Sequence, residues 1–151
     1  DPAQPPEIVD PFSPEQVSTH IGKGCGWDQF TDCLGFCRFN RGWEQTVPIL
    51  NAITGWDFTT QEAMQVGRRI VNLLRVFNLR HGLDPSLEVP SSSYGSTPVD
   101  GPAKGVSIRE QWDSMVRNYR RLMGWDEETG IPSPETLRKL GLGDLVGDLP
   151  R

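Results

Sequence analysis

The sequence predicts an all-α fold, because helix-start signals and 3.6-residue periodicity recur along it while no segment alternates like a strand. We expect one irregular domain of about five helices, with a long loop rich in proline, serine and glycine at residues 84–106. Residues 1–12 contain four prolines and are expected to form an extended lead-in to a helical domain at 13–151. A chain of 151 residues suits a single domain.

The first helix is predicted to begin after Ser13, which has the residue type of an N-cap. Pro14 follows at the first helical position, and Gln16 stands where its side chain could close a capping box. Two glycines before Trp27 are expected to interrupt this helix. Helix then resumes over about 27–34, which leaves the next few residues at its C-terminal end.

A short helix is predicted over 43–53, with a kink or a late start at Pro48. The clearest helix comes next, because Thr59 and Glu62 form a capping box and Gly82 ends the periodic pattern. Its apolar residues fall on one face: Ala63, Val66, Ile70, Leu73, Leu74 and Phe77. Its polar residues occupy the opposite side: Gln65, Arg68, Asn72 and Arg75.

The segment 84–106, with four prolines and three glycines, is longer than most loops of compact domains, and we expect it to lie over another domain or a partner. A second capping box, at Ser107 and Glu110, predicts the start of the next helix. That helix has an apolar stripe that we expect to be buried: Ile108, Trp112, Met115, Tyr119 and Leu122. A last short helix starts at Ser133-Pro134 and ends at Gly141.

Composition limits the function classes. The net charge is −5, from 15 basic and 20 acidic residues, and this balance disfavours binding to nucleic acid or to an anionic membrane. No apolar run approaches the ~18 residues that a membrane-spanning helix needs. The first residues are acidic and proline-rich, unlike a signal peptide, so we expect a cytoplasmic protein.

The chain has three cysteines, an odd number that excludes a complete disulfide framework. Cys25, Cys33 and Cys37 lie within thirteen residues. Such clustering suggests a metal or cluster in a reducing compartment, although buried core thiols would explain it equally well.

The run Asp32-Cys33-Leu34-Gly35-Phe36-Cys37 places groups suited to a cofactor close together. The carboxylate of Asp32 could accept charge-assisted hydrogen bonds from a heterocycle such as a pterin, or serve as a helix cap or an arginine partner. Gly35, without a Cβ, would let the backbone approach a cofactor closely. The thiolate of Cys37 is a possible iron ligand.

These residues resemble a motif of the tungsten-containing aldehyde ferredoxin oxidoreductase family. In the C-terminal domain of that family, Asp-x-x-Gly-Leu-Cys binds the tungsten-bearing pterin and supplies the fourth cysteine of a four-iron four-sulfur cluster. Asp32, Gly35 and Cys37 match it position by position, and Phe36 stands where the family usually has leucine. The likeness continues through later blocks: Thr54–Asp57, Gly67–Leu73, Phe77–Gly82, Gly124–Asp126 and Gly130–Pro134.

The resemblance implies an enzyme that oxidises a small aldehyde to a carboxylic acid and passes electrons to ferredoxin. It implies a tungsten or molybdenum bis-pterin cofactor contacted by Asp32, Gly35 and Phe36, with Cys37 as the cluster ligand and no catalytic side chain in this chain. The other three cluster cysteines and a further pterin-binding face belong to upstream domains of the same enzyme. We therefore expect the isolated chain to be inactive. Some relatives run different chemistry on this scaffold, so the resemblance does not fix the substrate.

Two other hypotheses remain open. His20, Cys25, Cys33 and Cys37 offer enough ligands for a structural zinc site, although their spacing matches no common zinc pattern. The chain could also be a cofactor-free interaction domain that has kept the helical scaffold.

Overall fold

The structure of the protein is a computed structural model, which describes residues 9–35 and 43–150. Six α-helices occur in this part of the chain: α1 Pro14–Gly24, α2 Trp27–Cys33, α3 Trp43–Thr54, α4 Thr60–Arg80, α5 Trp112–Met123 and α6 Pro134–Lys139. Three short 3-10 helices accompany them: η1 Pro85–Leu87, η2 Ile108–Glu110 and η3 Gly143–Asp148. These residues form no strand, so the predicted all-α fold is confirmed.

Local capping chemistry sets several helix starts. In three of the predicted N-caps the hydroxyl accepts a hydrogen bond from a backbone N–H three residues later: Ser13, Thr59 and Ser133. At α4 the side chain of Glu62 also accepts from the backbone N–H of Thr59, 2.8 Å away, which completes the capping box. Gln16 differs from the prediction, because its side chain accepts from the backbone N–H of Asp10 at 3.0 Å.

The helix predicted over 43–53 is confirmed, because α3 spans Trp43–Thr54; of the two alternatives at Pro48, the late start does not occur. The start predicted at Ser107 was wrong. Ser107 caps only η2, by accepting from the backbone N–H of Arg109 at 3.3 Å, and α5 begins at Trp112 without a side-chain cap. The predicted apolar stripe of this helix is half-buried at most of its positions, and Ile108 at its start is exposed.

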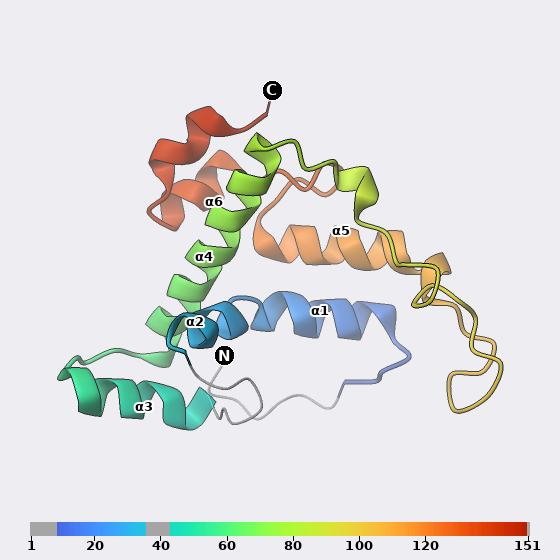
Figure 1. Ribbon diagram of the computed structural model, residues 1–151, viewed down its shortest axis with the longest axis horizontal. Helices are drawn as coiled ribbons and strands as arrows, with labels where there is room; N and C mark the ends of the chain where they lie inside the picture. The colour runs from blue at the N-terminus through green and yellow to red at the C-terminus, as the bar shows by residue number, and fades with distance from the viewer. Residues whose placement is uncertain (1–8, 36–42, 151) are drawn as a thin grey trace.

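α1 and α5 lie side by side and run in the same direction (Figure 1). The amide of Asn118 on α5 donates to the hydroxyl of Ser18 on α1 at 2.8 Å. One turn further along both helices, Gly22 faces Leu122 so closely that a Cβ on the glycine would lie 2.8 Å from the leucine Cδ1. α4 crosses the C-terminal ends of this pair, and α6 packs near the far end of α4 (Figure 1).

Two apolar clusters form at opposite ends of α4. The first joins α2, α3 and the start of α4: Phe30, Val47 and Ala63, with Trp27, Leu34, Leu50 and Phe58 around them. The second joins the end of α4 to α6 and η3: Val76, Leu137 and Leu142, with Leu140, Leu145, Val146 and Leu149. α4 therefore connects the two halves of the fold, with the motif-bearing helix α2 at one end.

The face of α4 that is buried differs from the one its amphipathic pattern indicates. The buried residues of this helix are Ala63, Gly67, Asn72, Arg75, Val76 and Leu79. Four residues of the apolar face are exposed: Val66, Leu73, Leu74 and Phe77. An amphipathic helix ordinarily turns its apolar stripe to the core. Here polar residues of α4 are buried instead, because other segments satisfy their hydrogen bonds.

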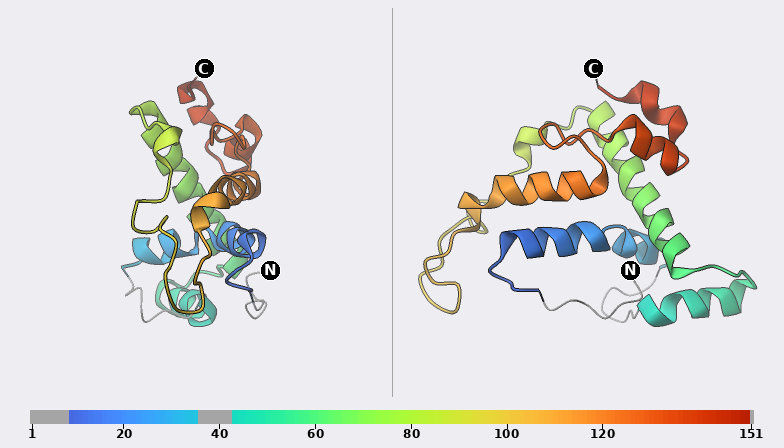
Figure 2. Two further views of the ribbon diagram at one scale, coloured as in Figure 1. Left: turned by 90° about the vertical axis from the view of Figure 1, so that its right-hand side faces the viewer. Right: turned by 180° about the vertical axis from the view of Figure 1, so that it is seen from behind.

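Residues 84–106 form a loop, as predicted, apart from the 3-10 turn η1 near its start. The loop extends beyond the N-terminal end of α5, away from the helices, and returns at η2 (Figures 1 and 2). Arg109 braces it by donating to the backbone carbonyl of Pro90 at 3.5 Å and by lying against Gly95. Its expected contact with another domain or a partner stays a prediction. None of the helices in the described ranges is long and apolar enough to span a membrane.

Candidate cofactor-binding site

The N-terminal end of α2 rests directly on the backbone of α4. Gly26, the N-cap of α2, has a φ of 109°, a conformation that favours glycine. A Cβ on Gly67 of α4 would lie 1.8 Å from the carbonyl oxygen of Gly26, and a Cβ on Gly26 would lie 2.6 Å from the backbone nitrogen of Arg68. Glycine is therefore required at both positions, and the contact fixes where α2 starts.

Arg68 holds the same junction from the other side. Its guanidinium donates to the backbone carbonyls of Gly22 at 2.9 Å and Lys23 at 3.4 Å, at the C-terminal end of α1. It also donates to the carbonyl of Leu122 at 3.3 Å, at the end of α5. The last carbonyls of a helix lack partners within the helix and carry partial negative charge. One cation thus satisfies the ends of two helices and ties both to α4.

The body of α2 is packed by aromatic rings. Phe30 is buried, with its ring centroid 5.6 Å from that of Trp27 and 6.1 Å from that of Phe58. The hydroxyl of Thr31, which is fully buried, donates within the helix to the carbonyls of Trp27 at 3.1 Å and Asp28 at 3.0 Å. α2 therefore presents its C-terminal turn from a fixed support.

That turn carries the described half of the predicted motif. The backbone N–H of Gly35 donates to the carbonyl of Asp32 at 3.0 Å, and Gly35 has a φ of 74°. Asp32, Cys33 and Gly35 are exposed, whereas Leu34 between them packs against the Phe30 cluster. A Cβ on Gly35 would meet no described atom within 4 Å. Glycine is therefore favoured here because of the positive φ and not because of a close neighbour.

The motif continues beyond the described residues. Phe36 and Cys37, the other predicted cofactor contact and the predicted metal ligand, lie outside them. Within the described part, Asp32 and Gly35 are brought together on one exposed turn. This arrangement places a carboxylate, which accepts hydrogen bonds, beside a glycine backbone, and such a pair fits a heterocycle that presents N–H groups at its edge.

The residues of the zinc alternative do not gather in the described part of the chain. Cys25 is half-buried, with its Sγ 3.1 Å from the phenolic oxygen of Tyr119, and burial raises the pKa of that tyrosine. Cys33 and His20 are exposed. No group of three or more potential histidine, cysteine or carboxylate ligands occurs among the residues that the structure describes. Cys37, the fourth member of the proposed set, lies outside them.

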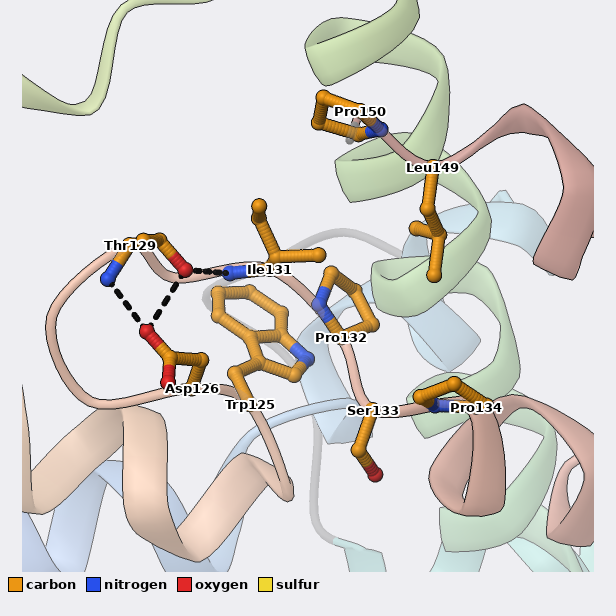
Figure 3. Close-up of a pocket in the computed structure, with 9 residues that line it drawn as sticks. All are labelled: Trp125, Asp126, Thr129, Ile131, Pro132, Ser133, Pro134, Leu149 and Pro150. Atoms are coloured by element: carbon orange, nitrogen blue, oxygen red, sulfur yellow. Dashed lines mark hydrogen bonds between the residues drawn. The ribbon is translucent and has the colours of Figure 1, made fainter.

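A hollow of about 530 Å³ lies far from α2, between the end of α5 and the C-terminal segment (Figure 3). Its walls are mainly apolar, from residues such as Trp125, Pro132 and Leu149. The one carboxylate there, Asp126, accepts from the backbone N–H and the hydroxyl of Thr129, both at 2.7 Å. These hydrogen bonds lower the pKa of Asp126 and occupy the carboxylate within its own turn, so the hollow offers no acid–base pair.

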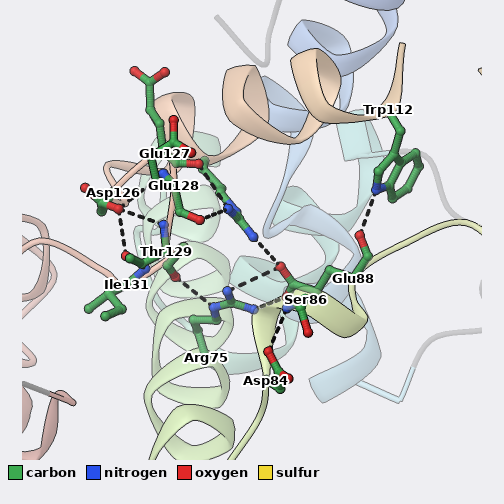
Figure 4. Close-up of polar contacts among 12 residues, drawn as sticks. Arg75, Asp84, Ser86, Glu88, Trp112, Asp126, Glu127, Glu128, Thr129 and Ile131 are labelled. Carbon is green, nitrogen blue, oxygen red and sulfur yellow. Dashed lines mark hydrogen bonds and ion pairs between the residues drawn. The ribbon is translucent and has the colours of Figure 1, made fainter. Parts of the chain in front are cut away.

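A buried polar cluster was missed by the sequence analysis (Figure 4). Glu88, just after η1, pairs with Arg75 of α4 and with Arg120 of α5, and the second ion pair measures 2.8 Å. Arg75 also donates to the carbonyl of Gly130 at 2.9 Å and lies 4.8 Å from the ring centroid of Trp125. The two arginine side chains are only 6% and 8% exposed. No local pattern predicts this cluster, because its members come from distant parts of the chain.

The cluster fixes the start of the long loop. Burial alone would raise the pKa of Glu88, but hydrogen bonds and positive charge from Arg75 and Arg120 outweigh it and lower that pKa. The backbone carbonyl of Glu88 also accepts from the indole N–H of Trp112 at 2.7 Å. Both polar ends of this residue are therefore tied to helices.

Comparison with known proteins identifies the chain's relatives. The family described as "Aldehyde ferredoxin oxidoreductase, domains 2 & 3" matches residues 2–142. The chain belongs to the aldehyde ferredoxin oxidoreductase family. It is 39% identical, over 115 residues, to the tungsten-containing aldehyde ferredoxin oxidoreductase of Pyrococcus furiosus, and 35% identical over 120 residues to that of Thermococcus kodakarensis. It is also 31% identical over 134 residues to an aliphatic sulfonate oxidoreductase, WOR-like subunit, of Pyrococcus furiosus.

The chain spans about a fifth of the length of these oxidoreductases. The matches cover 75%, 76% and 82% of this chain but 18%, 19% and 21% of the three relatives. The predicted site residues of this family member thus lie in a region that corresponds to about a fifth of its longer relatives. The resemblance inferred from the Asp32–Cys37 run is confirmed at the level of the family.

Proposed function

We propose that this chain is the C-terminal part of a tungsten-dependent oxidoreductase, in which the turn at the end of α2 contacts a pterin cofactor and Cys37 ligates a four-iron four-sulfur cluster. The observation that carries the proposal is the turn from Asp32 to Gly35. It combines an exposed carboxylate with a glycine at positive φ, on a helix held by direct backbone contact with α4. It occurs in a chain whose relatives are named as tungsten-containing.

Asp32 has the chemistry needed to orient a pterin. An ionised carboxylate only accepts hydrogen bonds, and the edge of a pterin presents N–H and amino donors. Gly35 has a left-handed backbone conformation, and a Cβ there would meet no described atom within 4 Å. Rigid support matters because a cofactor must be held within a fraction of an ångström of its working position. The packing of Phe30 and Thr31 behind the turn provides that support.

Cys37 is proposed as this chain's contribution to the iron–sulfur cluster. Such a cluster takes thiolates from four cysteines. Cys25 is already in contact with Tyr119, and no three potential ligands gather in the described ranges. The other cluster ligands would then come from the preceding part of the enzyme. When bound, the tungsten pterin supplies the two-electron oxidation of the substrate, and the cluster supplies single-electron transfer.

The substrate and the electron acceptor follow from the relatives rather than from a described pocket. Two of the relatives above are named aldehyde ferredoxin oxidoreductases, so we propose a small aldehyde as substrate and ferredoxin as acceptor. The third relative is named an aliphatic sulfonate oxidoreductase. An aliphatic sulfonate is therefore the first alternative substrate to test in activity assays.

The test is metal analysis of the enzyme purified anaerobically from its native host. We expect tungsten and about four irons for each copy of this chain. A Cys37→Ser variant should lose iron, because serine does not replace a thiolate as a cluster ligand. Cys33→Ser is the matched control, since it removes a thiol from the same exposed turn and should leave the iron content unchanged.

A second variant separates the proposed pterin contact of Asp32 from the proposed cluster ligation by Cys37. Asp32→Asn replaces a carboxylate by an amide of similar shape, which is a weaker acceptor for N–H groups. It should lower the tungsten and pterin content while leaving the iron content near that of the wild type. Unchanged iron in Cys37→Ser, or zinc in place of iron and tungsten in the wild-type protein, would refute the proposed function.

A further inference from the structure

The apolar face of α4 remains uncovered in the described structure. We call Val66, Ile70, Leu73, Leu74 and Phe77 the α4 stripe. Four of these side chains are strongly exposed, at 38% for Val66, 46% for Leu73, 51% for Leu74 and 55% for Phe77. Single exposed apolar residues are common on protein surfaces, whereas a contiguous apolar stripe marks a surface that binds another protein segment.

The α4 stripe continues a line of contact that α2 already uses. Positions 63, 67, 70, 74 and 77 follow one another along α4 at intervals of three or four residues, so they lie on one side of the helix. Ala63 and Gly67 on this line are buried, with Ala63 in the Phe30 cluster and Gly67 against Gly26 of α2. α2 thus covers the beginning of the line. Farther along, among the described residues, Ile70 is half-buried and Leu74 and Phe77 are exposed.

The other side of α4 is already occupied, so the α4 stripe cannot turn inward. Val76 packs against α6 and η3, and Asn72 accepts from the indole N–H of Trp125 at 2.8 Å. In the left-hand view of Figure 2, α5 and α6 lie on one side of α4, and α2 lies on the other side. The α4 stripe is therefore on the same side of α4 as the helix that carries Asp32.

We infer that the α4 stripe is the surface on which the preceding part of the oxidoreductase docks. This inference rests on the proposed function. The stripe continues the contact made by the motif-bearing helix, so a segment that approaches the Asp32 turn also reaches the stripe. The relatives are about five times as long as the stretch matched here, which leaves ample polypeptide to cover it. The partner surface should be apolar and uncharged, because the stripe contains no charged residue.

A second copy of this chain is the competing occupant. Each copy carries a net charge of −5, which disfavours close association of two identical surfaces but does not prevent it. The two occupants predict different complexes: one between unlike polypeptides, the other a homodimer.

The test uses the tagged 151-residue chain. It is co-expressed with the tungsten-containing aldehyde ferredoxin oxidoreductase of Pyrococcus furiosus from which the matching segment has been removed. Leu74→Glu places a charge in the middle of the α4 stripe. Ile21→Glu is the matched control, because Ile21 is an apolar residue on α1 with a similar exposure of 53%. Glutamate is well tolerated in helices, so both variants should keep the fold, which circular dichroism would verify.

We expect the wild type and Ile21→Glu to capture the relative's remaining polypeptide equally well, and Leu74→Glu to lower the yield by about tenfold or more, since it would bury an unpaired charge. Equal capture by Leu74→Glu, or no capture by the wild type, would overturn the inference. A wild-type homodimer that Leu74→Glu converts to a monomer would overturn it in favour of the second copy. If the complex forms as expected but Cys37→Ser keeps its iron, the docking surface stands and the proposed cluster ligand fails.

Discussion

The contact between Gly67 and Gly26 yields the sharpest test of how the site is positioned. A Cβ on Gly67 would lie 1.8 Å from the carbonyl oxygen of Gly26. The position of the Cβ is fixed by the backbone of α4, and its partner is a backbone oxygen, so no side-chain rotation can relieve the clash. The Gly67→Ala substitution must therefore push α2 away from α4 and disturb the packing that supports Asp32.

The size of the effect follows from this geometry. A carbon and a carbonyl oxygen in close contact stay about 3.3 Å apart, so α2 has to move on the order of 1.5 Å. Overpacking of a well-packed contact typically costs about 1–3 kcal/mol. Because the displaced atoms belong to a whole helix, we expect a loss of about 3 kcal/mol in the free energy of unfolding. This loss is larger than the gain of about 1 kcal/mol that alanine usually brings over glycine within a helix.

Two other glycines on helices provide an internal scale for the assay. A Cβ on Gly24 would meet no described atom within 4 Å, so Gly24→Ala should leave stability unchanged or raise it slightly. A Cβ on Gly22 would lie 2.8 Å from Cδ1 of Leu122, a flexible side chain that can shift, so Gly22→Ala should be intermediate. Urea unfolding followed by far-UV circular dichroism measures all three variants.

The predicted order of stability is therefore Gly24→Ala, then Gly22→Ala, then Gly67→Ala. In the complete enzyme, Gly67→Ala should also lower the tungsten content, since it moves the turn that carries Asp32. If Gly67→Ala were as stable as Gly24→Ala, the close approach of α2 and α4 would be refuted, and with it the argument that α2 is a fixed support.

Two further predictions concern the polar contacts. Glu88→Gln should lower the free energy of unfolding by about 2 kcal/mol, because it leaves two buried arginines without a carboxylate, whereas Glu110→Gln, at an exposed position, should change it little. The pKa of Glu88 is lowered from 4.5 in the folded state, so its contribution to stability is present above pH 4.5 and is lost as the pH falls through the lower folded-state value. Unfolding measured across acidic pH should show a shallower loss in Glu88→Gln. Arg68→Ala should cost about 2–3 kcal/mol by leaving carbonyls of α1 and α5 without their donor, and Arg69→Ala, at an exposed neighbour, should change stability by less than about 0.5 kcal/mol. Equal effects of the two arginine variants in the same urea assay would contradict the assigned role of Arg68.

The parts of the fold that sequence reasoning predicted are those set by local chemistry. Ser13, Thr59 and Ser133 start helices because a hydroxyl can accept from a backbone N–H three residues later, whatever the rest of the chain does. The end of α2 near Gly35 was predicted from local residue types, whereas the interest of Asp32 and Gly35 as site residues came from their resemblance to the family motif. The start of α5 was missed because Ser107 makes its bond within a 3-10 turn, which the same sequence pattern also permits.

The sequence does not show which element of the fold covers each face of a helix. Amphipathicity shows that α4 has an apolar stripe but not which element covers it. Asn72 and Arg75 look like solvent-facing residues in the sequence. They are buried because Trp125, Glu88 and Gly130 reach them from distant positions and satisfy their polar groups. No periodicity within α4 encodes those contacts.

The burial of polar residues in α4 and the exposure of its apolar stripe have a common consequence for the site. The polar side of α4 is satisfied within this chain, by hydrogen bonds that require specific partners at specific distances. The apolar side needs only a complementary surface, so a separate segment of the enzyme can cover it without leaving polar groups unpaired. α2 packs on the apolar side, at the beginning of the stripe, where its N-terminal end contacts Gly67 and its C-terminal end carries Asp32. If the Asp32 turn binds the cofactor as proposed, it is held rigidly within this chain before the rest of the proposed enzyme docks, and docking would close it off from water.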